Sequence, residues 1–317
     1  MQDVCLFAHF DKDNRLDDYV LRYLCEIREL GFATILISTS RLTAADIAPA
    51  RAFCSDVILR NNAGLDFASW SAGFAKHAAD INGRLLLAND SVYGPIGSLK
   101  NTLERLTHTA ADFYGMVESI ENAPHLQSWF LFFEPWVVRD PIFASTLEQP
   151  FSSMTKGQII ENGEVGFSRR LTKAGYRYEA LYMVSRGSPM ARNFPMNPMH
   201  LRWRELLFEA GVPFVKIELL RDNPVGVEDR ATILRCVAQL DPDIARLIAS
   251  HLARTAPEAP NQPRRAVLTR YCYALIRRYE AAKREKRHIT AAVTRLQLEI
   301  LAIPLAARRR IKTAAGL

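Results

Sequence analysis

The polar triplet Asn89-Asp90-Ser91 holds the carboxylate of this chain best placed to bind a cation. It directly follows the apolar run at 84–88, which is typical of a buried strand. Open α/β sheets bind their ligands beyond the carboxyl ends of the strands, so Asp90 would be positioned to contact a bound ligand. Such a carboxylate can hold a hard divalent cation, which in turn neutralises a diphosphate. The alternative is structural: Asn89 or Asp90 closes a turn.

Two glutamates, Glu161 and Glu164, precede an amphipathic pattern that Gly175 ends. One interpretation is a helix start, where a carboxylate is stabilised by free N–H groups and the helix dipole. The other is a general base that removes the proton of a hydroxyl nucleophile while a leaving group departs on the opposite side. The pattern alone leaves both open, and it does not say which glutamate would act.

Further candidates lie where other predicted strands end. His9 and Asp11 follow the first strand, and Asp66 lies between a strand and a helix, where it would accept hydrogen bonds from a ribose or a base or cap the helix. His200 opens a helical pattern, where a histidine is a metal ligand or, alternatively, a packed or capping residue.

The elements that position these residues alternate between strand and helix. Apolar β-rich runs and helical spacing predict strands at 4–7, 32–38, 56–59, 84–88, 112–118 and 126–133, and helices at 19–30, 64–78, 164–174 and 200–210. Strand, helix, strand, helix, strand indicates a parallel, doubly wound α/β sheet. After Pro224 the pattern becomes helical.

Composition excludes several classes of protein. The chain has 317 residues with 49% hydrophobic and 24% charged, enough to bury a full core without disulfides. Five widely spaced cysteines without a CxxC pair indicate thiols in a reducing compartment. No apolar run reaches about 20 residues and no signal peptide is visible, so we expect a cytoplasmic protein. GxGxxG, GxxxxGK[ST], GxSxG and HExxH are absent from the sequence, which removes the main support for Rossmann, P-loop, α/β-hydrolase and zinc-protease functions.

The basic charge is concentrated in the C-terminal tail. Residues 261–317 contain 14 Lys+Arg and 3 Asp+Glu, which leaves 27 against 31 for residues 1–260, or −4. No nucleic-acid partner is therefore expected. A proline-rich break at 255–265 precedes a seven-residue repeat of apolar residues: Leu268, Leu275, Ala282, Ile289, Leu296 and Ile303. Such a basic amphipathic tail would bind an anionic membrane surface, self-associate as a coiled coil, or pack against a partner transferase.

Six segments occur together in the order and spacing of one known family. GLDFASW, LLLANDSVYGP, DFYGMVES, HLQSWFLFF, ENGEVGFSRRLTKAGY and NPMHLRW with GVPFVKIELLRDNP make residues 3–226 resemble the rhamnan synthesis protein F family. The resemblance implies a bacterial glycosyltransferase of polysaccharide and O-antigen assembly. It implies a GT-A-like, nucleotide-diphosphosugar-binding sheet flanked by helices at 1–226, followed by a helical extension at 227–260 and the basic tail at 261–317.

The resemblance also implies roles for the candidate residues. Asp90 stands where the usual DxD motif would hold Mg²⁺ or Mn²⁺, although Asn89 replaces its first acid. Glu164 stands in the place of the general base of an inverting, direct displacement, and His200 would be an additional metal or phosphate contact. The remaining nucleotide-binding candidates are His9, Asp11, Asp66, Asn89 and Ser91.

The implied donor is dTDP-L-rhamnose or a related deoxyhexose nucleotide, and the implied acceptor is a lipid-linked glycan. With such an acceptor, the basic tail would hold the enzyme peripherally at the cytoplasmic face of the inner membrane. The alternative function is a non-catalytic sugar-nucleotide-binding or scaffold subunit of a polysaccharide assembly complex, which the missing first acid of DxD favours.

Overall fold

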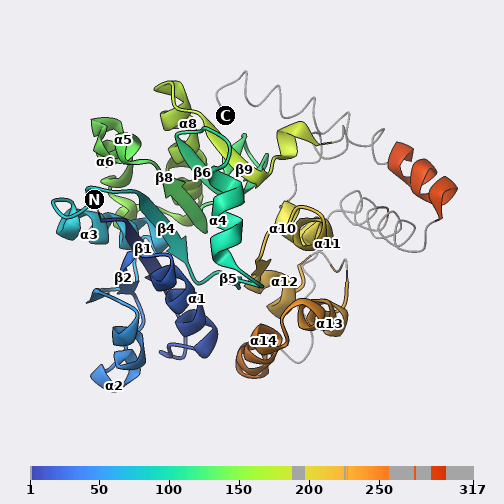
Figure 1. The fold of residues 1–317 in the computed structure, drawn as a ribbon, viewed down its shortest axis with the longest axis horizontal. Helices are drawn as coiled ribbons and strands as arrows, with labels where there is room; N and C mark the ends of the chain where they lie inside the picture. The colour runs from blue at the N-terminus through green and yellow to red at the C-terminus, as the bar shows by residue number, and fades with distance from the viewer. Residues whose placement is uncertain are drawn as a thin grey trace.

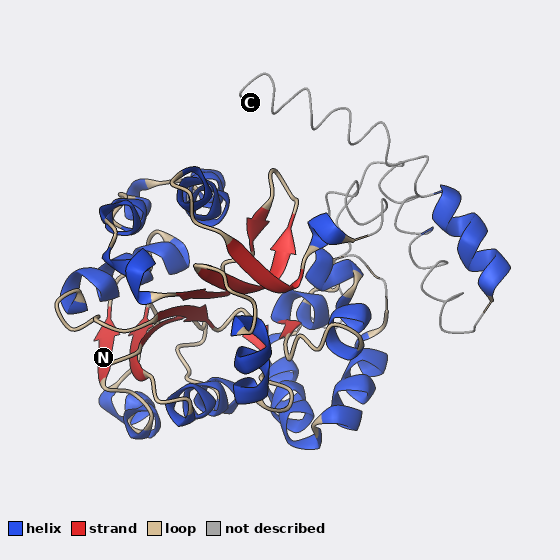
Figure 2. Cartoon of the chain, turned by 45° about the horizontal axis from the view of Figure 1, so that its top comes forward, coloured by secondary structure: helices blue, strands red, loops and turns tan. Residues whose placement is uncertain are grey.

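The computed structural model describes residues 2–187, 197–224, 226, 228–256, 275 and 287–297. At its centre lies an eight-stranded mixed sheet (Figure 1). Helices cover both faces of this sheet (Figure 2). The α/β class with a sheet flanked by helices, which the sequence predicted, is confirmed.

The first half of the chain forms the parallel part of the sheet. Four strands run parallel in the order β3-β2-β1-β4, which confirms the doubly wound arrangement predicted for this half. The predicted stop of the first helix is also confirmed, because Gly31 has a φ of 88° directly after it. The elements of this half are β1 (Val4–His9), α1 (Asp18–Glu29), β2 (Ala33–Ser38), α2 (Ala44–Ile47), β3 (Asp56–Leu59), α3 (Leu65–His77) and β4 (Leu85–Asn89).

The second half adds antiparallel strands beyond β4. Strand β8 pairs antiparallel with β4 and with β6, and β9 pairs parallel with β6. A separate two-stranded ribbon joins β5 to β10. The elements up to β9 are β5 (Val92–Tyr93), α4 (Leu99–Thr107), β6 (Phe113–Ser119), β7 (His125–Leu126), β8 (Phe130–Phe133), α5 (Pro135–Arg139), α6 (Pro141–Leu147), α7 (Lys156–Ile159), α8 (Val165–Lys173) and β9 (Tyr178–Tyr182).

The single strand predicted at 126–133 is wrong, because the chain forms two strands with a break between them. The break falls at Ser128, whose backbone N–H donates to the Glu164 carboxylate at 3.1 Å instead of to a neighbouring strand. The side chain of Gln127 is held there by two hydrogen bonds, one from the Trp129 indole at 2.9 Å and one to Asn197 at 2.9 Å.

The sheet separates two hydrophobic layers. Successive residues of a strand point to opposite faces, so Cys5 and Phe7 of β1 pack with α1, whereas Leu6 and Ala8 pack with α3. Helices α1, α4 and the C-terminal helices cover the first face, and α3, α5, α6 and α8 cover the second. The central strands are therefore covered by apolar side chains on both faces.

The C-terminal helices share the core of the sheet domain. The helix predicted at 200–210 is two short helices that meet at Arg202. Helices α13 and α14 pack with α1 in the first layer, through Ile233, Val237 and Ile248, each fully buried. Most of the tail predicted at 261–317, with its membrane and coiled-coil interpretations, lies outside the described residues. The remaining elements are α10 (Pro198–Leu201), α11 (Trp203–Phe208), β10 (Val215–Lys216), α12 (Ile217–Arg221), α13 (Arg230–Leu240) and α14 (Pro242–Thr255).

Candidate functional site

The carboxyl ends of β1 and β4 lie side by side and bring predicted site residues together. Strand β1 pairs with β2 on one side and with β4 on the other, so the chain order reverses at this point, where ligands of open α/β sheets bind. The Asp90 Oδ2 atom accepts a hydrogen bond from the backbone N–H of Phe10 at 2.9 Å. The Nε2 atom of His9 lies 3.8 Å from the same oxygen.

Two adjoining hollows open beyond these strand ends. The first chamber has a volume of about 570 Å³, and its walls include His9, Asp11, Asp66, Asp90 and Ser91. The second chamber has a volume of about 600 Å³, and its walls include Asp66, Asn89, Ser91, Ser128 and Glu164. They share five wall residues: Leu65, Asp66, Ser91, Lys156 and Lys216. The Asp90 and Glu164 side chains therefore line two adjoining chambers that share part of their walls.

Asn89 organises the wall between the chambers. Its Nδ2 group donates to Asp66 Oδ2 at 2.7 Å. Its Oδ1 atom accepts hydrogen bonds from the backbone N–H and the hydroxyl of Ser91, at 3.1 and 2.6 Å. Because Asn89 is also buried, its side chain is already committed to protein partners.

Of the two glutamates left open by the sequence, Glu164 lines the second chamber. The π-helical turn Ile160–Glu164 connects α7 to α8, so Glu164 lies inside a continuous helical segment and no side-chain cap is formed. Its Oε1 atom accepts hydrogen bonds from the backbone N–H and the hydroxyl of Ser128, at 3.1 and 3.2 Å. Glu161 instead pairs with Arg169 at 2.8 Å, with half of each side chain exposed. The helix-cap interpretation of Glu164 is thus wrong.

Burial changes the protonation of the groups around Asp90. Desolvation lowers the pKa of His9 to about 4, so its imidazole is neutral at pH 7. Burial raises the pKa of Asp66 to about 6. Burial, and then the nearby Asp66 carboxylate, raise the pKa of Asp90 well above its usual value. An opposing cation in the chamber would lower the pKa of both carboxyl groups.

His200, predicted as a metal or phosphate contact, faces Glu218 and does not line either chamber. Its side chain is buried, its Nε2 atom lies 3.4 Å from the carboxylate of Glu218, and it is absent from the walls of both chambers. Among the described residues, the ligand atoms of His200 and Asp90 do not belong to a common group of three or more within 4.8 Å.

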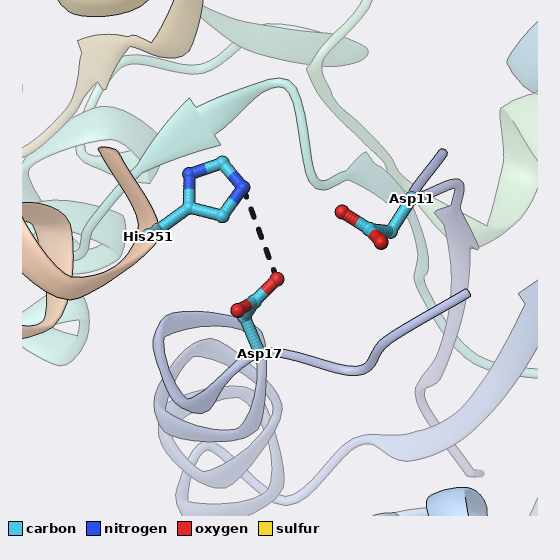
Figure 3. Close-up of side chains that lie close together, drawn as sticks. All are labelled: Asp11, Asp17 and His251. Atoms are coloured by element: carbon cyan, nitrogen blue, oxygen red, sulfur yellow. Dashed lines mark ion pairs between the residues drawn. The ribbon is translucent and has the colours of Figure 1, made fainter. Parts of the chain in front are cut away.

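A different group, Asp11, Asp17 and His251, brings three ligand atoms within 4.8 Å of one another (Figure 3). The guanidinium of Arg254 already donates hydrogen bonds to both carboxylates, to Asp11 Oδ2 at 2.8 Å and to Asp17 Oδ2 at 2.5 Å. Although burial opposes it, hydrogen bonding from Arg254 lowers the pKa of Asp11. The His251 Nδ1 atom lies 2.6 Å from the Tyr93 hydroxyl. A metal ion would therefore have to displace Arg254.

Among the wall residues that escaped the sequence analysis are four charged ones, Lys12, Lys156, Lys216 and Glu121. Lys216 is the one with a local signal, since it directly follows the apolar run at 212–215 and a strand end is where ligand-facing residues are sought. Glu121 lies in the turn between β6 and β7, where burial raises the pKa of its carboxyl group. Nothing in the periodicity of their own segments marks Lys12 or Lys156.

Two relatives are similar to this chain in sequence. The virulence protein VirA of Vibrio anguillarum is 28% identical over 255 residues, covering 70% of this chain and 81% of VirA. The uncharacterized protein y4gN of Sinorhizobium fredii is 27% identical over 158 residues, covering 48% of this chain and 41% of y4gN.

Solved structures give weaker matches. A cytidylyltransferase from Leptospira borgpetersenii matches with a TM-score of 0.33 and 11% identity, over 58% of this chain and 80% of that one. Mouse xyloside xylosyltransferase 1 in its apo form matches with a TM-score of 0.31 and 12% identity, over 56% and 84%. Within the described ranges, no helix is both long and apolar enough to cross a membrane.

The match that assigns the family covers most of the chain. A sequence model described as rhamnan synthesis protein F matches residues 34–293. It reaches past residue 226, where the resemblance noted from sequence motifs ends, so α13 and α14 fall within it. This chain belongs to the rhamnan synthesis protein F family.

Proposed function

We propose that this protein is an inverting glycosyltransferase that moves a sugar from a nucleotide-diphosphate donor to a glycan acceptor. Membership of the rhamnan synthesis protein F family supports a glycosyltransferase-like role. The observation that carries the proposal is the pair of adjoining chambers with a shared wall, with Asp90 in the first chamber and Glu164 in the second. A displacement needs a leaving-group site and a base on opposite sides of the reacting carbon, and two adjoining chambers offer this.

The donor would occupy the first chamber, with its nucleotide against His9, Asp11 and Asp66. The family description supports L-rhamnose or a related deoxyhexose as the sugar, with dTDP-L-rhamnose as the first donor to test. The acceptor, proposed to be a lipid-linked glycan of polysaccharide or O-antigen assembly, would enter the second chamber. Amide and hydroxyl groups on that wall, from Asn122, Ser128 and Asn197, are suited to hydrogen-bond sugar hydroxyls.

Glu164 would act as the general base. One of its oxygens is held by Ser128, which fixes the direction of the carboxylate, and the other is left to accept the proton of an acceptor hydroxyl. The acceptor oxygen forms a bond to the anomeric carbon as the bond from that carbon to the phosphate oxygen breaks. The electron pair of the broken bond stays on the departing diphosphate, and the transition state has oxocarbenium character.

A divalent cation, Mg²⁺ or Mn²⁺, fits the first chamber only as an ion with few protein ligands. Asp90 has one oxygen taken by the N–H of Phe10, which leaves its Oδ1 atom, and the Asn89 oxygen is taken by Ser91. Mg²⁺ is often bound by one or two carboxylates plus substrate phosphates, so Asp90 remains the candidate ligand, and His200 would contribute only after a rearrangement. Such an ion would neutralise charge on the donor diphosphate.

The test compares two variants with a matched control from the same helical segment. Glu164→Gln should reduce transfer by about 100-fold or more, the usual range for a lost acid–base group. Asp90→Asn should also reduce transfer, because it removes the charge of the candidate cation ligand. Both variants should have unchanged circular dichroism. Glu161→Gln should keep wild-type turnover, because Glu161 faces solvent. Products from a panel of nucleotide sugars and lipid-linked acceptors would be measured by mass spectrometry.

Wild-type turnover in Glu164→Gln would contradict the assigned base.

The second candidate function, a non-catalytic sugar-nucleotide-binding or scaffold subunit, is favoured by Asn89 in the place of the first acid of DxD. It predicts that the wild-type protein binds donors in calorimetry and forms no product with any pair in the panel.

A further inference from the structure

Three lysines from separate segments line the first chamber. Lys12 follows β1, Lys156 begins α7, and Lys216 lies on β10. Within the described ranges, no carboxylate oxygen lies within 4.0 Å of any of these three ammonium groups. Other cations around the chamber are neutralised, since Arg221 pairs with Asp222 at 2.8 Å and Arg254 pairs with Asp11 at 2.8 Å. Lysines that converge on one hollow without carboxylate partners favour an anionic ligand.

Lys216 is the best placed of the three. It lines both chambers and is half-buried, whereas Lys12 and Lys156 are exposed. Its backbone is fixed beside the strand-end residues, because it pairs with Val92 across the β5–β10 ribbon and the N–H of Ile217 donates to the carbonyl of Ser91 at 3.1 Å. Its ammonium group acts electrostatically on the carboxylates of Asp66 and Glu121, one on the shared wall and one in the second chamber.

The reacting bond would lie at this shared wall. With the base in the second chamber and the donor phosphates in the first, the bond from the anomeric carbon to the phosphate oxygen must cross the boundary between them. We infer that Lys216, assisted by Lys12 and Lys156, binds the donor diphosphate and neutralises the negative charge that it gains on departure. This inference rests on the proposed function. Lys216 donates N–H hydrogen bonds to the diphosphate and takes no part in the proton transfer, in which the acceptor proton goes to Glu164.

A lysine in this role makes diphosphate binding partly independent of metal. The Asn89 oxygen already accepts two hydrogen bonds from Ser91, and one Asp90 oxygen accepts a hydrogen bond from Phe10. Few oxygens on this wall therefore remain to bind a cation. The ammonium group of Lys216, in contrast, is part of the protein and is present whether or not a metal ion is bound. Appreciable affinity for a nucleoside diphosphate should therefore remain when divalent cations are removed.

Isothermal titration calorimetry with dTDP and with inorganic pyrophosphate, in excess EDTA, tests this inference on the full-length chain. Lys216→Gln should weaken binding of both probes about tenfold or more, as expected for a lost charge-assisted hydrogen bond. Lys216→Arg should recover most of the affinity, because it keeps the charge. Lys100→Gln is the control, since Lys100 is exposed on α4 and outside both chambers. Circular dichroism melting confirms that each variant is folded.

The outcomes separate this inference from the transferase proposal. Wild-type affinity in folded Lys216→Gln, or wild-type binding that needs Mg²⁺ or Mn²⁺, overturns the role of Lys216 and leaves the transferase proposal intact. Loss of binding in Lys216→Gln, in a protein that transfers no sugar in the product assay, supports the diphosphate site and counts against the transferase. Failure of the wild type to bind either probe under any metal condition overturns both.

Discussion

Asp66 is the carboxyl group where the two chambers meet. It accepts a hydrogen bond from Asn89 Nδ2 at 2.7 Å, and the charge of Glu164 raises its pKa while the charge of Lys216 lowers it. Burial is the largest influence and raises its pKa to about 6. Because the unfolded chain releases this proton near pH 4, the folded state holds more protons between pH 4 and 6. Folding therefore loses stability as the pH rises through this window.

Asp66→Asn should remove the loss of folding stability that the wild type shows as the pH rises from about 4 to about 6. At pH 7.5 the variant should be more stable than the wild type by roughly 2–3 kcal/mol, since an asparagine oxygen can still accept from Asn89 and carries no charge to desolvate. The advantage should shrink as the pH falls towards 4, where the wild-type carboxyl group is protonated as well. Urea unfolding at several pH values measures this difference. A difference that does not change with pH would contradict the raised pKa of Asp66.

Sequence reasoning at this scale was most useful at the ends of strands. His9 ends β1 and Asp90 directly follows β4, and both line the first chamber because strand ends gather at one edge of a parallel sheet. Asp66, in the first turn of α3, lines the same chamber. Sequence reasoning failed for Lys156, whose place in the wall depends on a segment far from Asp90 in sequence and which no local pattern marks. It also passed over Lys216, although an apolar run directly precedes that residue.

At the scale of elements, the helical segment at 156–173 determines where Glu164 points. A π-helical turn between α7 and α8 changes the direction of the side chains that follow, and such turns are frequent at functional sites. Gly163 lets this turn approach α3: a Cβ atom built there would lie 2.9 Å from two atoms of the Phe67 ring. Phe67 is buried in the second layer and cannot move freely.

Gly163→Ala should therefore displace the turn and the carboxylate after it. We expect a loss of about 1–3 kcal/mol in the free energy of unfolding, typical of an overpacked core, together with reduced transfer. Gly157→Ala in the same segment is the control, because nothing lies within 4 Å of its added methyl group and alanine favours the helix. Chemical denaturation and the product assay measure both effects. Equal stability of the two variants would show that the contact with Phe67 does not constrain the turn.

The elements that sequence reasoning missed are those broken by contacts with distant residues. The apolar run at 126–133 reads as one strand, and what divides it is the hydrogen bond from Ser128 to Glu164, 36 residues away. The helix predicted at 164–174 begins earlier because the turn at 160–164 joins it to α7. By contrast, β1, β2 and β4 follow from their apolar runs alone, since burial on both faces leaves a continuous hydrophobic signal.

At the scale of the whole molecule, α13 and α14 are joined both to the core and to the site. Ile233, Val237 and Ile248 are fully buried in the layer that also contains α1 and β1. From the end of α14, Arg254 holds Asp17 and also Asp11, which lines the first chamber. Cutting the chain before α13 would remove part of the core and leave clustered carboxylates without their guanidinium, which is costly for partly buried charges.

A chain that ends at residue 226, the boundary predicted from sequence, should therefore fail to unfold cooperatively. Because such a truncation can fail for other reasons, a point variant in α14 sharpens the test. Ile248→Ala should lower the free energy of unfolding by about 2–5 kcal/mol within a single transition, while Arg246→Ala on the exposed face of the same helix should change it by less than about 1 kcal/mol. Calorimetry follows both variants. Two transitions, of which only one shifts in Ile248→Ala, would mean that α13 and α14 unfold independently of the sheet. In that case, folding of the strand-end site would not depend on Arg254.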